Sequence, residues 1–262
     1  MRRHAGFTLV ELVTVILILG ILAVGVSGFL IFGTRIFMDA SATDRLIGSS
    51  RFVVERLSRE LQGSIPGSVR LSHNNQLQCV EFLPQQASGS YLTLPVTAQT
   101  RDDNMQVFTP KTVLQAGMQL LVYPLSAADV YDASRSKRFN VKSVSSSGAV
   151  TDIVFDTPVI FAEASPSKRW YAAAQPVSYC FFATGQIRRY GAYGYQLSQP
   201  LPPASTGVLM AEDLGNDFSS QLPLALTPAS LTNNAIVQLR PRFNLLGESF
   251  TYQHQVQVFN VP

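Results

Sequence analysis

The strongest constraint on the fold is the stretch at residues 12–34, which carries no charge and is rich in Leu, Ile and Val. At ~1.5 Å per residue, a helix of this length crosses the ~30 Å hydrocarbon core of a bilayer with some room for tilt. An ordinary secretory signal also has a basic start and an apolar run, but its run normally lasts about 7 to 15 residues and ends at an Ala-x-Ala-like site. The longer run here continues into an amphipathic pattern, which favours a retained membrane helix.

Basic residues near the start predict the orientation of this helix. Arg2 and Arg3 precede the apolar run, and the positive-inside bias favours a cytoplasmic location for that short end. Arg35 follows the run and opposes this bias weakly. We therefore expect one membrane crossing, with everything after Arg35 on the far side.

A carboxylate inside the apolar run requires a partner. Glu11 lies one residue before the uncharged stretch and is flanked by Val10 and Leu12. An ionised acid in such surroundings is costly unless a cation neutralises it. Glu11 therefore predicts a site where a positive group from elsewhere is bound.

At these positions the chain resembles the type IV prepilin family, whose short basic leader ends in Gly and is followed by Phe-Thr-Leu-x-Glu. The matching residues are Gly6, Phe7, Thr8, Leu9 and Glu11. The resemblance implies that a prepilin peptidase/N-methyltransferase cuts between Gly6 and Phe7 and methylates the new amine of Phe7. In a staggered stack of helices, Glu11 of one subunit can then neutralise the amine of another and so fix the register. A plain signal anchor is the alternative interpretation.

The resemblance also implies a location and partners. The precursor is expected in the inner membrane, as a single-pass protein with a cytoplasmic N-terminus and a periplasmic C-terminal domain, and in a pilus after assembly. Its expected partners are the peptidase and other major and minor pilins, which it contacts through the N-terminal helix.

The pattern after Arg35 predicts that the helix continues as an amphipathic segment to about residue 62. One face carries Ile36, Ala40, Thr43, Ile47, Ser50, Val54, Leu57 and Leu61, at steps of three and four. Gly63 and Pro66 are expected to end the helix. The apolar face needs a sheet to cover it, and a free amphipathic stalk is the alternative.

The remainder of the chain alternates short apolar runs with turn signals, which indicates antiparallel strands. The expected strands are 78–83, 91–96, 119–123, 139–144, 150–155, 177–183, 186–190, 208–211, 235–239 and 250–259. Thr184-Gly185 is expected to be a hairpin turn, and the polar residues Ser143 to Gly148 a surface loop.

Together these patterns predict an α+β fold of the type IV pilin kind. A long N-terminal α-helix, transmembrane and then amphipathic, packs on an antiparallel β-sheet-rich C-terminal domain. The expected divisions are a leader peptide at 1–6, a helix at 7–62 and an exported β-rich domain at 63–262.

Two cysteines, Cys79 and Cys180, lie in the part expected outside the cytoplasm, where accessible thiols tend to pair. We expect one disulfide between them, and two separate buried thiols are the alternative.

The exported part lacks the residues of common catalytic sites. Its only histidines are His73 and His254, and it has no Cys-x-x-Cys, His-Glu-x-x-His or Gly-x-Ser-x-Gly motif. We therefore expect no enzymatic activity, no metal and no cofactor. Asp102-Asp103-Asn104 could offer oxygen ligands to calcium, but a solvated turn is the more ordinary interpretation.

The composition excludes a nucleic-acid partner. The formal charge of +3 includes Arg2 and Arg3, so the exported part is close to neutral and carries no basic stripe. Charged residues make up only 14% of the chain, against the roughly 25% usual for soluble domains. Two aromatic features could form a partner-binding surface, although burial in the core is the more ordinary interpretation. These are Trp170 and the segment with Arg188, Arg189, Tyr190, Tyr193 and Tyr195.

A second resemblance is to the minor pilins of the mannose-sensitive haemagglutinin (MSHA) pilus, of the MshO type. It is carried by the segments 177–181, 186–190 and 256–262. It implies a minor pilin that acts in pilus biogenesis, in the complex that initiates the pilus tip. A minor pseudopilin of a type II secretion system, a tip adhesin and a membrane-anchored enzyme are the alternatives.

Overall fold

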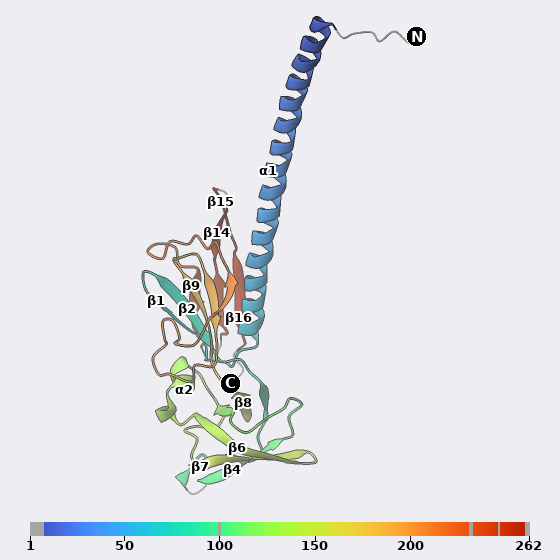
Figure 1. The fold of residues 1–262 in the computed structure, drawn as a ribbon. Coiled ribbons are helices and arrows are strands. Elements are labelled where there is room, and N and C mark those ends of the chain that lie inside the picture. The colour runs from blue at the N-terminus through green and yellow to red at the C-terminus, as the bar shows by residue number, and fades with distance from the viewer. Residues whose placement is uncertain (1–7, 99–100, 231–232, 246, 260–262) are drawn as a thin grey trace. The chain divides into compact units, whose positions relative to one another are not determined.

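The computed structural model describes residues 8–98, 101–230, 233–245 and 247–259 (Figure 1). In chain order, its elements are α1 (Leu9–Gln62), β1 (Arg70–His73), β2 (Leu77–Phe82), β3 (Ala87–Ser90), β4 (Asp102–Phe108), β5 (Gln119–Val122), α2 (Ala127–Tyr131), η2 (Ala133–Arg135), β6 (Arg138–Ser147), β7 (Val150–Val159), β8 (Arg169–Ala173), β9 (Val177–Phe182), β10 (Ile187–Tyr190), β11 (Val208–Ala211), β12 (Leu224–Thr227), β13 (Ala235–Leu239), β14 (Arg242–Leu245), β15 (Glu248–Thr251) and β16 (His254–Val258).

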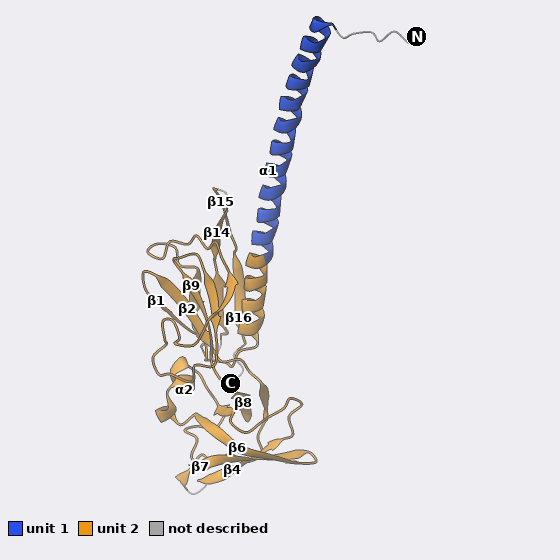
Figure 2. Ribbon diagram, viewed as in Figure 1, with its two compact units in different colours: residues 1–48 blue, residues 49–262 orange. Residues whose placement is uncertain are grey.

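The chain divides into two compact units between Gly48 and Ser49, inside α1 (Figure 2). The first unit contains the N-terminal part of α1, and the second contains its last turns together with all of the strands. The helix ends at Gln62, but the unit boundary comes earlier, because residues from 49 onward pack with the strands. The predicted α+β fold class, a long helix with an antiparallel sheet-rich C-terminal domain, is confirmed.

The end of α1 follows from its sequence. The amide of Gly63 still donates to the carbonyl of Arg59, at 3.2 Å, and the amide of Ser64 donates to Leu61, at 3.1 Å. Pro66 follows and cannot continue the helical hydrogen bonds.

The second unit is built around a five-stranded antiparallel sheet in the order β1-β2-β9-β10-β11, which we call the base sheet. Strands β9 and β10 form the hairpin predicted at Thr184-Gly185. Gly185 has a φ of +92°, in the region that favours glycine, and its amide donates to the carbonyl of Phe182.

The C-terminal strands form two further sheets, β12-β13-β16 and β14-β15. The prediction of one continuous strand at 250–259 is wrong, since the chain leaves the ladder between β15 and β16. The reason lies on the opposite strand, where Pro241 interrupts β13 and β14 and has no amide to donate. At this break, Tyr252 donates its own amide to the carbonyl of Pro241, at 3.0 Å.

Residues 84–175, which we call the inserted module, lie between two neighbouring strands of the base sheet. Strands β2 and β9 pair in continuous register from Leu77 opposite Phe182 to Phe82 opposite Val177. The chain between them forms a separate six-stranded sheet in the order β3-β8-β5-β6-β7-β4. Figure 1 shows β4, β6 and β7 at the end of the second unit opposite β14 and β15.

The sheet of the inserted module closes on itself. Tyr91, directly after β3, forms an antiparallel bridge with Val107 of β4, which joins the first and last strands of the order. Inside lies a buried cluster in which Met105, Phe155 and Phe161 are surrounded by residues of the module alone. Closure leaves few exposed strand edges in this part of the chain.

Two local predictions in this region are wrong. Residues 91–96 do not form a strand, because the amides of Leu92 and Thr93 both donate to the carbonyl of Gln106 and Pro95 has no amide. The serine-rich segment at 143–147 is not a loop but the end of β6, paired with β7. The serines of this segment are exposed to solvent, where polar side chains are favoured.

Candidate processing site and assembly helix

The predicted cleavage residues Gly6 and Phe7 lie outside the described residues, so the structure says nothing of their geometry. Thr8 is the first residue that the structure describes, and it caps α1. The Thr8 hydroxyl oxygen accepts a hydrogen bond from the amide of Glu11, at 3.3 Å, and the Thr8 carbonyl accepts one from Leu12, at 3.2 Å. A threonine in this position satisfies helix amides that have no partner within the helix.

This cap was not predicted, although its signal is visible in the sequence. Thr8 and Glu11 have the Ser/Thr-x-x-Glu spacing of a capping box. The cap starts the helix at Leu9, one residue after the threonine. Thr8 therefore fixes where the regular helix begins relative to the predicted scissile bond.

Glu11, the predicted register residue, lies in the first turn of α1. Its side chain is exposed, and so are those of its apolar neighbours, with Val10 70% and Leu12 54% exposed. A carboxylate near the N-terminus of a helix is favoured by the helix dipole. The carboxylate is thus available to an incoming cation within an apolar surface.

The N-terminal part of α1 is apolar on all of its faces. Among the described residues, α1 is the one helix that is long and apolar enough to cross a membrane. Its large apolar side chains, including Leu17, Phe29 and Phe32, are exposed within the first unit. A helix of this kind requires lipid or other helices around it.

Small residues on this helix leave room for another helix to pack closely against it. A side chain added at Gly20, Gly25 or Gly28 would meet nothing within 4 Å. Such positions allow the backbones of helices in lipid to approach closely.

The last turns of α1 are amphipathic as predicted, but over a shorter length. Val54, Leu57 and Leu61 are buried, whereas Ile36 and Ile47 on the same predicted face are 54% and 45% exposed. Within the second unit, the buried face of α1 is therefore the one that carries Val54, Leu57 and Leu61.

Polar contacts fix these last turns on the base sheet. Glu60 pairs with Arg189 of β10, at 3.1 Å, and with Arg56 one turn earlier, at 3.0 Å. Burial raises the pKa of Tyr179 in β9 well above its usual value, and the nearby Glu60 carboxylate raises it further. Ser50 contacts the hydroxyl of Tyr252, at 3.2 Å.

The two cysteines form one disulfide, which joins neighbouring strands. Cys79 of β2 and Cys180 of β9 are directly opposite in the ladder, with their Cα atoms 4.1 Å apart. Both side chains are fully buried.

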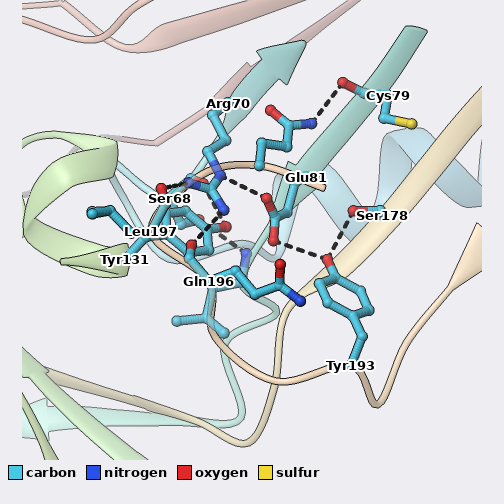
Figure 3. Close-up of polar contacts among 11 residues, drawn as sticks. Ser68, Arg70, Cys79, Glu81, Tyr131, Ser178, Tyr193, Gln196 and Leu197 are labelled. Atoms are coloured by element: carbon cyan, nitrogen blue, oxygen red, sulfur yellow. Dashed lines mark hydrogen bonds and ion pairs between the residues drawn. The ribbon is translucent and has the colours of Figure 1, made fainter. Parts of the chain in front are cut away.

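Side chains of the predicted aromatic segment make contacts within the fold, as Figure 3 shows for Tyr193. The Tyr193 hydroxyl donates to the carboxylate of Glu81, at 3.0 Å, and contacts Ser178, at 2.8 Å. Tyr190 is buried, and Arg189 is paired with Glu60. Trp170 is likewise fully buried, inside the module.

Asp102, Asp103 and Asn104 were expected in a turn but begin β4. In the ladder, Asp102 is opposite Val159 and Asn104 is opposite Val154. Within the described residues, no group of three or more His, Cys, Asp or Glu side chains is arranged to hold a metal ion.

Comparison with known proteins adds one finding. Residues 1–27 match the family described as the prokaryotic N-terminal methylation motif. Neither a curated protein nor a solved structure matches the chain. The motif supports a type IV pilin-like or pseudopilin-like protein. It implies processing by prepilin peptidase and assembly with other pilins, and with the long apolar helix it suggests membrane anchoring.

Proposed function

We propose that this chain is a minor pilin of a type IV pilus of the MSHA kind, of the MshO type, which acts in pilus biogenesis within the tip-initiating complex. The observation that carries the proposal is the methylation motif at residues 1–27, continuous with a helix whose apolar side chains are exposed on every face. Such a helix fits a protein that moves from a membrane into a bundle of similar helices.

The proposed maturation uses the residues around the start of α1. Cutting after Gly6 releases the basic leader and leaves an ammonium group on Phe7. In the proposed assembly, the carboxylate of Glu11 of a neighbouring subunit neutralises that cation. Thr8 accepts from the amide of Glu11 and so holds the first turn of the helix in place.

A minor position in the filament is supported by the size and placement of the exported part. Major pilins are typically shorter, whereas this chain adds a whole module between two strands of its base sheet. The module begins beside the C-terminal end of α1, where the amide of Ile65 donates to the carbonyl of Leu83. A bulky addition there favours a position that few subunits in the filament occupy.

A minor pseudopilin of a type II secretion system is the second candidate, because it shares the motif and the helix. A tip adhesin is a third. Deletion of the gene distinguishes the three: loss of pili supports the structural minor pilin, retained pili with lost exoprotein secretion supports the pseudopilin, and normal pili with lost binding supports the adhesin.

We also propose that the role is structural and not enzymatic. The exported part has only His73 and His254 as histidines, and it lacks the nucleophile and metal motifs named above. Substrate turnover by the purified exported part would contradict this proposal.

The direct test of the proposal is mass spectrometry of the N-terminus in purified filaments. We expect the chain to be present, to begin at Phe7 and to carry one methyl group on its amine. A chain that still carries Met1 within a filament would overturn the processing scheme.

A further inference from the structure

We infer that the inserted module is a cooperative unit that opens separately from the base sheet, that processing and assembly do not need it, and that the Cys79–Cys180 disulfide holds its base closed. Where filament assembly is the readout, this inference rests on the proposed function.

The first observation is that the base sheet is complete without the module. Phe82 and Val177, the last paired residues before and after it, face each other in the ladder of β2 and β9. A short turn could join them, as in an ordinary hairpin. The insertion therefore interrupts no pairing of the base sheet.

The second observation is that the module has its own core. Its buried cluster draws on residues 87–172. Phe139 packs against the rings of Phe155 and Phe161 in this cluster, and the centroids of the three rings lie 4.8 to 6.1 Å apart. The bridge from Tyr91 to Val107 closes the surrounding sheet. A closed sheet with a separate core is the physical basis of a cooperative unit that opens by itself.

The third observation is that two side-chain contacts of the last turns of α1 lie outside the module. Glu60 contacts Arg189 of β10, and Ser50 contacts Tyr252. These contacts belong to the base sheet and to the C-terminal part of the chain.

A defined joint fixes the module on the base sheet. The Arg70 guanidinium lies 3.6 Å from the ring centre of Tyr131 in α2, whose hydroxyl donates to the carbonyl of Ser68 (Figure 3). Arg138 of the module lies 4.1 Å from the ring centre of Tyr195. The backbone at Gly67 comes so close to Pro124–Ser126 that a Cβ there would lie 3.0 Å from backbone atoms.

The disulfide lies at the base of the insertion. Cys79 is three residues before the end of β2, and Cys180 is three residues after the start of β9. The bond thus ties together the two strands from which the module emerges. If the module opens or is pulled, the bond prevents β2 from separating from β9.

The loop at residues 191–207 covers this bond. Tyr193 and Leu201 pack on the buried cluster that contains both cysteines, and the Gln199 amide donates to the carbonyl of Cys79, at 2.9 Å. The disulfide is therefore shielded on the side of this loop.

The test is hydrogen exchange, followed by mass spectrometry, on the full chain in detergent micelles. Phe161→Ala removes a ring from the core of the module. With the disulfide intact, we expect protection to fall about tenfold or more in β4 to β8, with little change in β2 and β9. When Phe161→Ala is combined with Cys79→Ser and Cys180→Ser, we expect a larger loss in β2 and β9 than the two cysteine changes cause alone.

Phe243→Ala is the matched control, since Phe243 is a fully buried ring that packs with two other rings among the C-terminal strands. It should lower protection there and leave β4 to β8 unchanged. Equal loss in the module and in β2 and β9 for Phe161→Ala alone would overturn the separate module. A loss in β2 and β9 of the combined variant no larger than that of the two cysteine changes alone would overturn the role of the disulfide.

A second experiment tests assembly. It uses a variant in which Asn-Gly replaces residues 84–175, so that Leu83 and Pro176 flank a short turn between Phe82 and Val177. We expect this chain to form its disulfide, to be processed and to enter filaments as the parent chain does. Correct disulfide formation without entry would overturn the inference. If the parent chain itself does not enter filaments, the proposed function fails, and hydrogen exchange still decides the inference.

Discussion

At the scale of single residues, the start of α1 combines three chemical requirements in a few positions. In the proposed function, the peptidase requires a small residue at Gly6 and the filament core requires a counter-charge at Glu11, while the helix requires a cap at Thr8. The structure contributes the cap, with Thr8 accepting from the amide of Glu11. The same residue that is predicted to set the register is thus also held by the cap.

Glu11→Ala should be processed normally but incorporated poorly into filaments. Without the carboxylate, the ammonium of a neighbouring Phe7 would be buried unpaired, at a cost of about 3–5 kcal/mol. The measurement is the ratio of filament-bound to membrane-bound mature chain. Asp39→Ala removes an exposed acid from the same helix and should behave like the parent. Equal incorporation of the two variants would exclude Glu11 as the register residue.

Gly6→Val should leave the precursor uncut in the membrane. A branched side chain next to the scissile bond obstructs the peptidase, while the apolar helix and its insertion are unchanged. Gel mobility and N-terminal sequencing report the outcome, and His4→Ala serves as a processed control. A mature Phe7 terminus in the Gly6→Val variant would contradict the assigned cleavage site.

At the scale of elements, the buried pair of Arg70 and Glu81 connects β1, β2 and the covering loop. The Glu81 side chain is fully buried and lies 2.6 Å from the Arg70 guanidinium. Arg70 also donates to the carbonyls of Leu197, at 2.7 Å, and Gln196, at 2.9 Å. The ion pair therefore links β1 to β2, and the two carbonyl contacts of Arg70 hold the covering loop against these strands.

Glu81→Ala should be strongly destabilising, by about 3–5 kcal/mol in the free energy of unfolding, because it leaves Arg70 buried without its partner. Urea unfolding of the full chain in detergent measures this. The double variant Arg70→Met with Glu81→Leu should recover much of the loss, since it removes both charges. A Glu81→Ala variant as stable as the parent would mean that water already satisfies Arg70.

The elements also show which structural features can be predicted from the sequence. The helix, its apolar run and the turn at Thr184-Gly185 depend on neighbouring residues and were predicted. The break after β15 was missed because its cause, Pro241, lies on the opposite strand. The length of β6 was missed because its exposed serines are typical of a loop, although β7 supplies their ladder partners.

At the scale of the whole molecule, one part of the chain depends on interactions between consecutive residues, and another depends on pairing between residues far apart in the sequence. The assembly helix could be predicted because its chemistry lies within a few consecutive residues. The inserted module could not, because the pairing of β2 with β9 joins residues about a hundred positions apart, as the separation of 101 between the cysteines illustrates. The expected pairing of Cys79 with Cys180 came from compartment and count, not from geometry.

Loss of the disulfide should destabilise the second unit without changing its fold. A bond that closes a loop of about 100 residues removes chain entropy from the unfolded state, and such bonds typically contribute about 2–5 kcal/mol. Cys79→Ser with Cys180→Ser should lower the urea midpoint accordingly and leave the circular dichroism spectrum unchanged. An unaltered midpoint would show that the base sheet holds these strands together unaided.

Because Phe82 and Val177 face each other in the ladder, the segment between them could be replaced by another domain. A foreign domain whose two termini lie one strand spacing apart could occupy the place of residues 84–175 and leave every pair of the base sheet intact. Under the proposed function, a filament would then display that domain at the few positions that this chain occupies.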